Sequence, residues 1–228
     1  MNYTYKALFL IFIILLFNIY NLSAQNNFIS FYESDRSLVF LSDNKVNTEI
    51  FLDSIDLHYL NAVIFHLTNI ERVKKNLELL KFHHNLYKSS ILHSEKMIEH
   101  DFFNHINKIE KKWSSPSDRI LYFDNSYISL AENILENNIL SYKGKSLVYR
   151  TEYSDDGSII YLDLNGEIIS YSTYIELSER LLAQWMNSTP HRKNILNSSF
   201  NLMGCACAID KTKIPALLRC TQNFGQIN

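Results

Sequence analysis

The most informative stretch of the chain is Trp185-Met-Asn-Ser-Thr-Pro-His-Arg-Lys-Asn-Ile-Leu196, close to the C-terminus. It ends a segment, residues 174–187, in which leucines and Trp185 recur on one side of a helix. Ser188 and His191 stand three residues apart, a spacing that a single helix would bring onto one face. Pro190 argues against such a helix, because the residue before a proline is biased away from helical dihedrals. We therefore predict a helix over about Tyr174–Asn187 that does not run on through Pro190.

Helical periodicity also governs the part of the chain before residue 120. From Asp56 to Leu80, apolar residues recur every three or four positions and predict one long helix. Asp53, Ser54 and Asp56 are its candidate N-caps. A second helix is predicted over Leu86–His100, and a short one opens just after Pro116. The remaining histidines lie on these helical stretches and are predicted to be surface or helix-end residues: His58, His66, His83, His84, His93 and His100.

Two other regions favour strands. Residues 141–172 contain an Asp-Gly turn and an Asn-Gly turn between apolar runs, which predicts a three-strand β-meander. The segments 202–209 and 216–224 predict two antiparallel strands that carry all three cysteines. In an oxidising compartment one disulfide would join Cys220 to Cys205 or Cys207. Three reduced thiols buried in a strand remain the alternative.

The N-terminus is typical of an exported protein. Lys6 precedes an 11-residue apolar run, and the small-residue site Leu22-Ser23-Ala24 follows, which is the layout of a secretory signal peptide over residues 1–24. A retained anchor is disfavoured because Asn18 and Asn21 interrupt a run too short to span a bilayer. We therefore expect cleavage near Ala24 and a secreted, extracellular or periplasmic protein without a stable membrane span.

Composition adds limits on size and partners. The chain has 228 residues, 46% hydrophobic, and a net charge of −2, which indicates one domain and gives no field that would attract nucleic acid. Residues 25–54 are predicted to be an N-terminal extension with two short β-prone runs, 28–32 and 38–41. The sequence does not indicate an oligomeric state.

Four segments, in this order, resemble the CAP superfamily (cysteine-rich secretory, antigen 5 and pathogenesis-related 1 proteins, or SCP domain), in its bacterial extracellular branch. They begin with Asn69-Ile-Glu-Arg72, Phe102-Phe-Asn-His105 and Ala131-Glu-Asn-Ile134. The fourth is the Trp185–Leu196 stretch, continued by Gly204-Cys-Ala206 and Thr221-Gln-Asn-Phe-Gly225. The resemblance implies an α+β fold over residues 55–228, an α-β-α sandwich with a central antiparallel sheet, with the meander at 141–172 as an insertion.

The resemblance also implies a cleft lined by two histidines and two glutamates. Three of these positions are matched by His105, Glu132 and His191, and the fourth, which would be a glutamate, is Ser188. Two imidazoles and one carboxylate could bind Zn²⁺ with an open position for water. They could equally be hydrogen-bonded residues that fix loops, with Glu132 paired to Arg119 or Arg192.

Two functions follow from that cleft. The favoured one is a binding module for a small apolar ligand, a lipid, a sterol or a peptide, with a divalent metal as a further candidate ligand. The alternative is a metal-assisted hydrolase that uses a His₂Glu zinc site. A Ser–His–Glu hydrolase built on Ser188 is disfavoured because the chain has no Gly-x-Ser-x-Gly turn. Because one of the four cleft positions is changed, binding is favoured over catalysis.

Overall fold

The computed structural model describes residues 29–32, 37–142 and 148–227. The signal peptide expected at residues 1–24 lies outside these ranges. The chain divides into two compact units, residues 1–35 and 36–228, and the second unit contains the sheet and its covering helices. None of the described helices is long and apolar enough to cross a membrane.

A mixed four-stranded sheet forms the centre of this unit, with strand order β1-β5-β6-β2. Its bounds are Lys81–Phe82 for β1, Ser129–Asn138 for β2, Leu202–Asp210 for β5 and Leu217–Gln226 for β6. The central strand β6 is antiparallel to both of its neighbours, β5 and β2, as predicted, but the short β1 runs parallel to β5. The sheet is therefore mixed. The parallel strand arises where the connection between two helices passes the edge of β5, and there the His83 N–H donates to the Met203 carbonyl.

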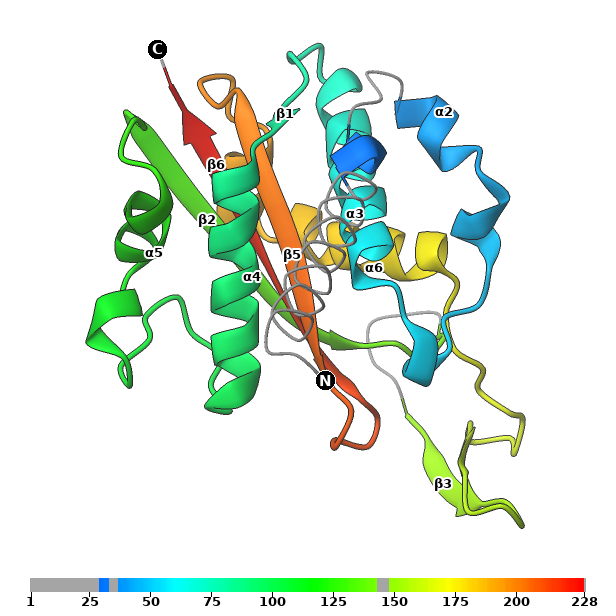
Figure 1. Cartoon of the computed structure of the whole chain (residues 1–228). Coiled ribbons are helices and arrows are strands. Elements are labelled where there is room, and N and C mark those ends of the chain that lie inside the picture. The colour runs from blue at the N-terminus through cyan, green and yellow to red at the C-terminus, as the bar shows by residue number, and fades with distance from the viewer. Residues whose placement is uncertain (1–28, 33–36, 143–147, 228) are drawn as a thin grey trace, which may run out of the picture. The chain divides into compact units, whose positions relative to one another are not determined.

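Helices cover both faces of this sheet, which makes the α-β-α sandwich that was predicted (Figure 1). The faces can be told apart along β6, where successive side chains point in opposite directions. Thr221 and Asn223 bond to serines of α4 (His84–Glu99). Gln222, between them, donates to Thr68 of α3 (Leu57–Val73). The second layer is completed by α6 (Tyr174–Asn187) and α7 (Thr189–Ile195), and α5 (Pro116–Phe123) lies beside α4.

Close packing of α4 on β5 depends on one glycine. A Cβ added to Gly204 would lie 2.1 Å from the backbone nitrogen of Tyr87, so any other residue would displace the helix. Next to this contact, the Ser90 hydroxyl donates to the Gly204 carbonyl and the Ser94 hydroxyl donates to the Ala206 carbonyl. Two small polar side chains thus hold the helix against the sheet.

The long helix α3 begins as predicted but ends earlier. Its N-cap is Asp56, whose side chain accepts a hydrogen bond from the Tyr59 N–H. The prediction of one helix up to Leu80 is wrong, because α3 ends at Val73 and Asn76 has a left-handed φ of 55°. Leu80 is buried by a turn back onto α3, where Asn69 bonds to both its N–H and its carbonyl.

The two β-prone runs of the N-terminal extension are not strands. Ser30–Tyr32 forms a 3₁₀ turn and Ser37–Leu41 a short α-helix, α2. Within α2, the Phe40 ring stacks on His66 at 4.3 Å and packs against Tyr59 of α3. Packing on α3 therefore overrides a β propensity that has no neighbouring strand to satisfy it. Two 3₁₀ turns, Asn44–Asn47 and Leu52–Ser54, complete the segment.

The predicted meander has two strands rather than three. The hairpin of β3 (Arg150–Tyr153) and β4 (Ile159–Leu162) forms, with Gly157 at a left-handed φ of 81° in its turn. The third run contributes one bridge to the hairpin, between Leu162 and Ile168, and a second bridge, between Tyr171 and Leu140, to the segment after β2. It leaves the hairpin because Ser170 and Ser172 bond instead to the backbone that follows β2.

The cysteines follow the predicted strands. Cys207 of β5 and Cys220 of β6 face each other in the ladder and form a disulfide, whereas Cys205 is a free, buried thiol. One of the two predicted pairings is therefore confirmed. Burial raises the pKa of the Cys205 thiol, which keeps it protonated and unreactive.

Candidate functional site

The four residues of the predicted cleft come from four different elements. His105 lies in the loop after α4, Glu132 in β2, His191 in α7, and Ser188 between α6 and α7. Because β2 is an edge strand of the sheet, both helical layers can reach it there. Glu132 is paired in register with Asn223 and points to the α4 side, whereas the neighbouring Asn133 bonds to Gln222 on the α3 side.

Glu132 is buried and fully engaged by its neighbours. Both of its carboxylate oxygens accept hydrogen bonds of 2.9 Å from Nη2 of Arg119, and Oε1 accepts a third, also 2.9 Å, from Nδ1 of His105. Burial by itself would raise the pKa of Glu132, but the His105 hydrogen bond and the Arg119 charge outweigh it and hold that pKa below its usual value. Glu132 is therefore a carboxylate at neutral pH, and Arg119 is the partner that the sequence left undecided.

Arg119 is held in place by the short helix α5. Ser115 and Asp118 form a reciprocal capping box at the start of that helix, one turn before the arginine. The fully buried guanidinium also donates to the carbonyls of His105, Trp113 and Ser114. It therefore ties the loop that carries His105 to the same carboxylate that orients the His105 ring.

The tautomer of His105 follows from this arrangement. A carboxylate can only accept hydrogen bonds, so Nδ1 of His105 must carry the proton that it shares with Glu132. In the neutral ring, the other nitrogen, Nε2, is then the one that carries the lone pair. The His105 side chain is 43% exposed, so this nitrogen belongs to an accessible ring.

His191 is the second accessible imidazole. It is half-buried, and burial together with the nearby His105 lowers its pKa, so that it is neutral at pH 7. Its carbonyl accepts a hydrogen bond from Asn133, whose side-chain oxygen accepts one from Asn194. These bonds attach the first turn of α7 to β2, and thereby place His191 on the same edge of the sheet as Glu132.

Ser188 joins two helices. Its backbone is extended, so α6 ends there and α7 starts anew at Thr189, with Pro190 in its first turn. The prediction that α6 does not continue through Pro190 is confirmed, but the break lies at Ser188, and Thr189 and Pro190 begin the next helix instead of staying outside one. Among the hydrogen bonds between described residues, none joins the Ser188 hydroxyl to His191. The described residues therefore do not show the Ser188–His191 hydrogen bond that would activate Ser188 as a nucleophile.

His93 also belongs to the site, contrary to the prediction for that residue. It is fully buried under Glu132, with Nε2 3.1 Å from the Asn104 carbonyl and 3.8 Å from Oε1 of Glu132. Burial lowers the pKa of His93 to about 4 despite the nearby carboxylate, so the ring is neutral. The prediction of surface or helix-end positions is wrong for His93 and also for His66, which is equally buried. Helical spacing from Leu86, Ser90 and Met97 was the available signal.

The residues do not fit a three-ligand zinc centre. The Glu132 oxygens already accept from a guanidinium that cannot lose its proton, and a metal at that carboxylate would have to displace Arg119. Over the described ranges, the ligand atoms of three His, Cys, Asp or Glu residues come within 4.8 Å of one another in one group, Glu99, His100 and Glu110, and not in the predicted trio. In that group Lys96 pairs with both carboxylates.

The open edge of β2 is covered by side chains of α6 and α7. Its outward carbonyls accept hydrogen bonds in turn from four side chains: Asn194 to Glu132, Trp185 to Ile134, Gln184 to Glu136 and Arg180 to Asn138. Two of these donors, Trp185 and Asn194, belong to the Trp185–Leu196 stretch, so covering the edge of β2 is one structural role of that stretch. They protect an edge strand that would otherwise be free to pair with another chain.

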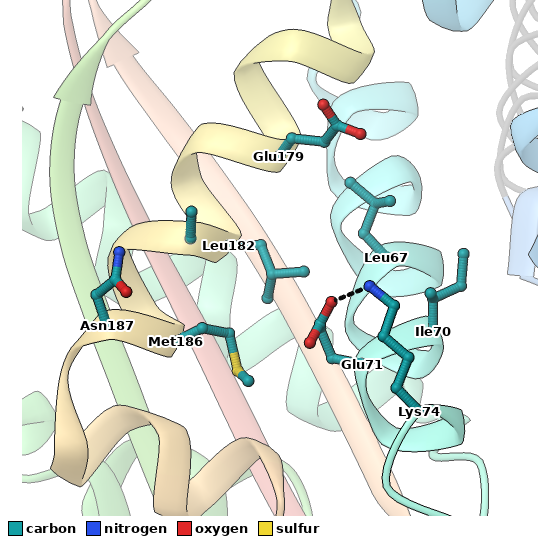
Figure 2. Close-up of a pocket in the computed structure, with 9 residues that line it drawn as sticks. Leu67, Ile70, Glu71, Lys74, Glu179, Leu182, Met186 and Asn187 are labelled. Atoms are coloured by element: carbon teal, nitrogen blue, oxygen red, sulfur yellow. Dashed lines mark hydrogen bonds and ion pairs between the residues drawn. The ribbon is translucent and has the colours of Figure 1, made fainter. Parts of the chain in front are cut away.

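A separate cavity of about 300 Å³ lies between α3 and α6 (Figure 2). Its walls come from both helices and are partly apolar, with Leu67 and Ile70 on α3 and Leu182 and Met186 on α6, and partly polar. Charged side chains stand at the rim, where Lys74 pairs with Glu71 at 2.6 Å. No pattern in the sequence indicated this cavity, because the same leucines also fit the continuous core predicted for both helices.

Comparison with known proteins agrees with this fold. The CAP family model, described as the cysteine-rich secretory protein family, matches residues 65–224. The uncharacterized protein YkwD of Bacillus subtilis (strain 168) is 29% identical over 160 residues, which are 70% of this chain and 46% of YkwD. The chain thus spans a little under half the length of that relative.

Two solved structures are also similar. An outer surface protein from Borrelia burgdorferi has a TM-score of 0.51 at 17% identity, over 76% of this chain and 97% of that chain. An extracellular protein containing a SCP domain from Bacillus anthracis str. Ames has a TM-score of 0.49 at 22% identity, over 76% of this chain and 44% of that one. At these identities, what the likeness to the Borrelia protein shows is the fold alone.

Proposed function

Because the chain belongs to the CAP (cysteine-rich secretory protein) family, we propose that it is a binding module for a small apolar ligand, held between α3 and α6. The observation that carries this proposal is the cavity of about 300 Å³, whose size is at the lower end of small-molecule sites. Apolar side chains from both helices form part of its lining, and polar and charged side chains, among them the Lys74–Glu71 ion pair, form the rest. Such a site suits a short acyl chain or a comparable apolar group.

The His/Glu cleft supports binding better than hydrolysis. A His₂Glu zinc hydrolase would need Glu132 as a ligand, and both of its oxygens are engaged by Arg119. In this arrangement Glu132 orients His105 from behind, as carboxylates commonly do for metal-binding histidines. That observation favours a second candidate function, in which Nε2 of His105 and the ring of His191 together bind a divalent cation. Zinc bound there would act as a Lewis acid toward whatever ligand occupied its open positions.

We also propose that the mature protein works outside the cytoplasm. The Cys207–Cys220 disulfide requires an oxidising compartment, and the N-terminal residues 1–24 are typical of a signal peptide. The structurally similar Borrelia protein is an outer surface protein, which agrees with such a location.

The test of the main proposal is binding of a short-chain apolar probe, decanol, measured by calorimetry. Ala183→Trp and Leu182→Ala change the cavity in opposite directions; Leu121→Ala, on the exposed surface of α5, is the matched control. We expect saturable decanol binding that A183W weakens at least tenfold and L121A leaves unchanged. Binding that both α6 variants leave within twofold of the wild type, or no binding at all, would contradict the proposal.

The cation candidate has its own measurement. Zinc titration should show one weak site per chain that His105→Ala and His191→Ala each abolish, and that Glu132→Gln weakens about tenfold or more through the orientation of His105. His100→Ala is the control for the separate group at Glu99 and Glu110. Zinc binding that depends on His100 but not on His105 would refute this candidate.

A further inference from the structure

A second cavity lies on the other side of α6, between that helix and the end of β2. It has a volume of about 750 Å³ and a polar lining. Its walls carry four carboxamides, one arginine and one tyrosine: Asn137, Asn138, Gln184, Asn187, Arg180 and Tyr142. Because most small-molecule sites are mainly apolar, a lining of this kind suits a ligand that is itself rich in hydrogen-bonding groups.

Arg180 differs from the other buried arginines of the domain. Arg119 and Arg219 pair with carboxylates, and Arg72 donates to four backbone carbonyl oxygens. Arg180 makes two hydrogen bonds, from Nη1 to the Ser172 hydroxyl and from Nη2 to the Asn138 carbonyl. In the described part of the chain no carboxylate forms an ion pair with its guanidinium, and its Nε has no hydrogen-bond partner, which is also true of the Nε of Arg119.

Partial burial of a cation that has no directly bonded carboxylate is costly, and this one is fixed in position. Burial lowers the pKa of Arg180, although the charge of Glu176, one turn earlier on α6, acts in the opposite direction. Its guanidinium lies over the ring of Tyr142, 4.4 Å from the centroid, so the fork cannot turn away freely. The one acidic residue in the cavity wall, Glu136, is already bound to Arg219 through a hydrogen bond of 2.8 Å.

We propose that this cavity binds a small carboxylate that carries several hydroxyl groups, as an acidic sugar does, with Arg180 as the partner of the carboxylate. A planar guanidinium matches a carboxylate in geometry and charge. Asn137 and Gln184 already bond to each other, and Gln184 also donates to the Glu136 carbonyl, but each of these two amide nitrogens keeps a second N–H for a ligand hydroxyl group. The site is distinct from the cavity between α3 and α6, although Ala183 and Asn187 of α6 line both cavities.

The test compares two sugars that differ in one carboxylate, D-glucuronate and D-glucose, by titration calorimetry and by chemical-shift changes of the full chain. We expect glucuronate to bind in the millimolar range, at least tenfold more tightly than glucose, and less tightly as salt is added. Arg180→Gln should weaken glucuronate binding at least tenfold, and Arg180→Lys should weaken it less, because lysine keeps the charge but loses the fork. Arg150→Gln, on the exposed hairpin strand β3, should change nothing.

Three results would overturn the proposal: no glucuronate binding at about 20 mM, glucose binding as tight as glucuronate binding, or R180Q binding glucuronate within twofold of the wild type. If R180Q does not fold, Gln184→Ala decides, since that side chain is exposed and lines the same cavity. Loss of less than twofold in Q184A, with unchanged shifts at Arg180 on addition of glucuronate, would equally refute it.

Discussion

Replacing Arg119 with methionine should destabilise the domain by about 3–5 kcal/mol at pH 7, because it leaves a buried carboxylate without its partner. Arg119→Met removes both hydrogen bonds to Glu132 and the three bonds to the carbonyls of His105, Trp113 and Ser114. Methionine fills a similar volume, so little of the loss should come from a void. For a chain of this size the change corresponds to a fall of roughly 6–20 °C in Tm.

The dependence on pH separates the charge from the packing. In the wild type the pKa of Glu132 lies below its usual value, so its stabilising contribution is present above the pKa of the unfolded state and is lost as pH falls through the folded pKa. In R119M, burial dominates and raises the pKa of Glu132. The folded variant then binds this proton more readily than the unfolded chain does, so the contribution of Glu132 to its stability should rise as pH falls from 7 to 5, while the loss that His93 causes is common to both proteins. The gap between the two proteins should narrow over that interval.

The assay is urea denaturation followed by circular dichroism at pH 7 and pH 5, on R119M, Glu132→Gln and the double variant. Because the two side chains contact each other, the double variant should be about 2 kcal/mol more stable than the sum of the single losses predicts. Arg192→Met is the control, since Arg192 donates a single bond to the Met186 carbonyl and should cost about 1 kcal/mol. Additive losses in the double variant, or a gap that widens at pH 5, would refute this reasoning.

Three further predictions concern the fold and its titration. Gly204→Ala should lower the free energy of unfolding by more than about 3 kcal/mol or prevent folding, because the new Cβ would lie 2.1 Å from the Tyr87 nitrogen. If thermal melting shows a loss of stability below about 1 kcal/mol, this close packing is contradicted. Without reductant, a thiol reagent should react with no cysteine in the native protein and with one cysteine in guanidinium. Cys207→Ser should lower the free energy of unfolding by about 3 kcal/mol, since the disulfide joins residues with a sequence separation of 13. Two or more reactive thiols in the native protein would exclude the disulfide and the burial of Cys205. His93 has a pKa of about 4 in the folded state against 6.5 ordinarily, so the unfolded chain binds more protons between these values and stability should fall by up to about 3 kcal/mol as pH drops through them. His93→Asn should flatten that part of the stability profile, and an unchanged profile would show that His93 does not cause it.

Local signals in the sequence predicted most of the elements. The helix α6 was predicted with its observed bounds, because its apolar side is regular and its flanking residues break it. Asp56 was among the expected N-caps, and the two cysteine-bearing strands pair as expected. In each case residues within one helical turn or one hairpin decide the outcome.

Errors arose where distant contacts compete with local preference. The third strand of the meander is lost because its serines bond to the segment after β2, a pairing that no local pattern signals. The helix α3 stops at Val73 because the chain turns back, and buried Arg72 then donates to the Glu78 carbonyl. The leucines after Val73 have a spacing that fits a helix, although they lie in that turn, and this spacing led to the wrong prediction.

The candidate site was predicted in its residue types but not in their roles. A family resemblance placed His105, Glu132 and His191 in one cleft, and both Arg119 and Arg192 were open as partners for the glutamate. The structure selects Arg119 through the capping box of α5, which fixes an arginine 13 residues away from Glu132. No spacing rule predicts such a bond, because its geometry depends on how α4, α5 and β2 pack.

The role of Glu132 can be tested by diffraction from crystals soaked in zinc, with data collected at the zinc absorption edge. We expect any anomalous peak in this cleft to lie at the Nε2 nitrogens of His105 or His191, with both Glu132 oxygens still about 2.9 Å from Arg119. A peak about 2 Å from a Glu132 oxygen, with Arg119 moved aside, would contradict this expectation.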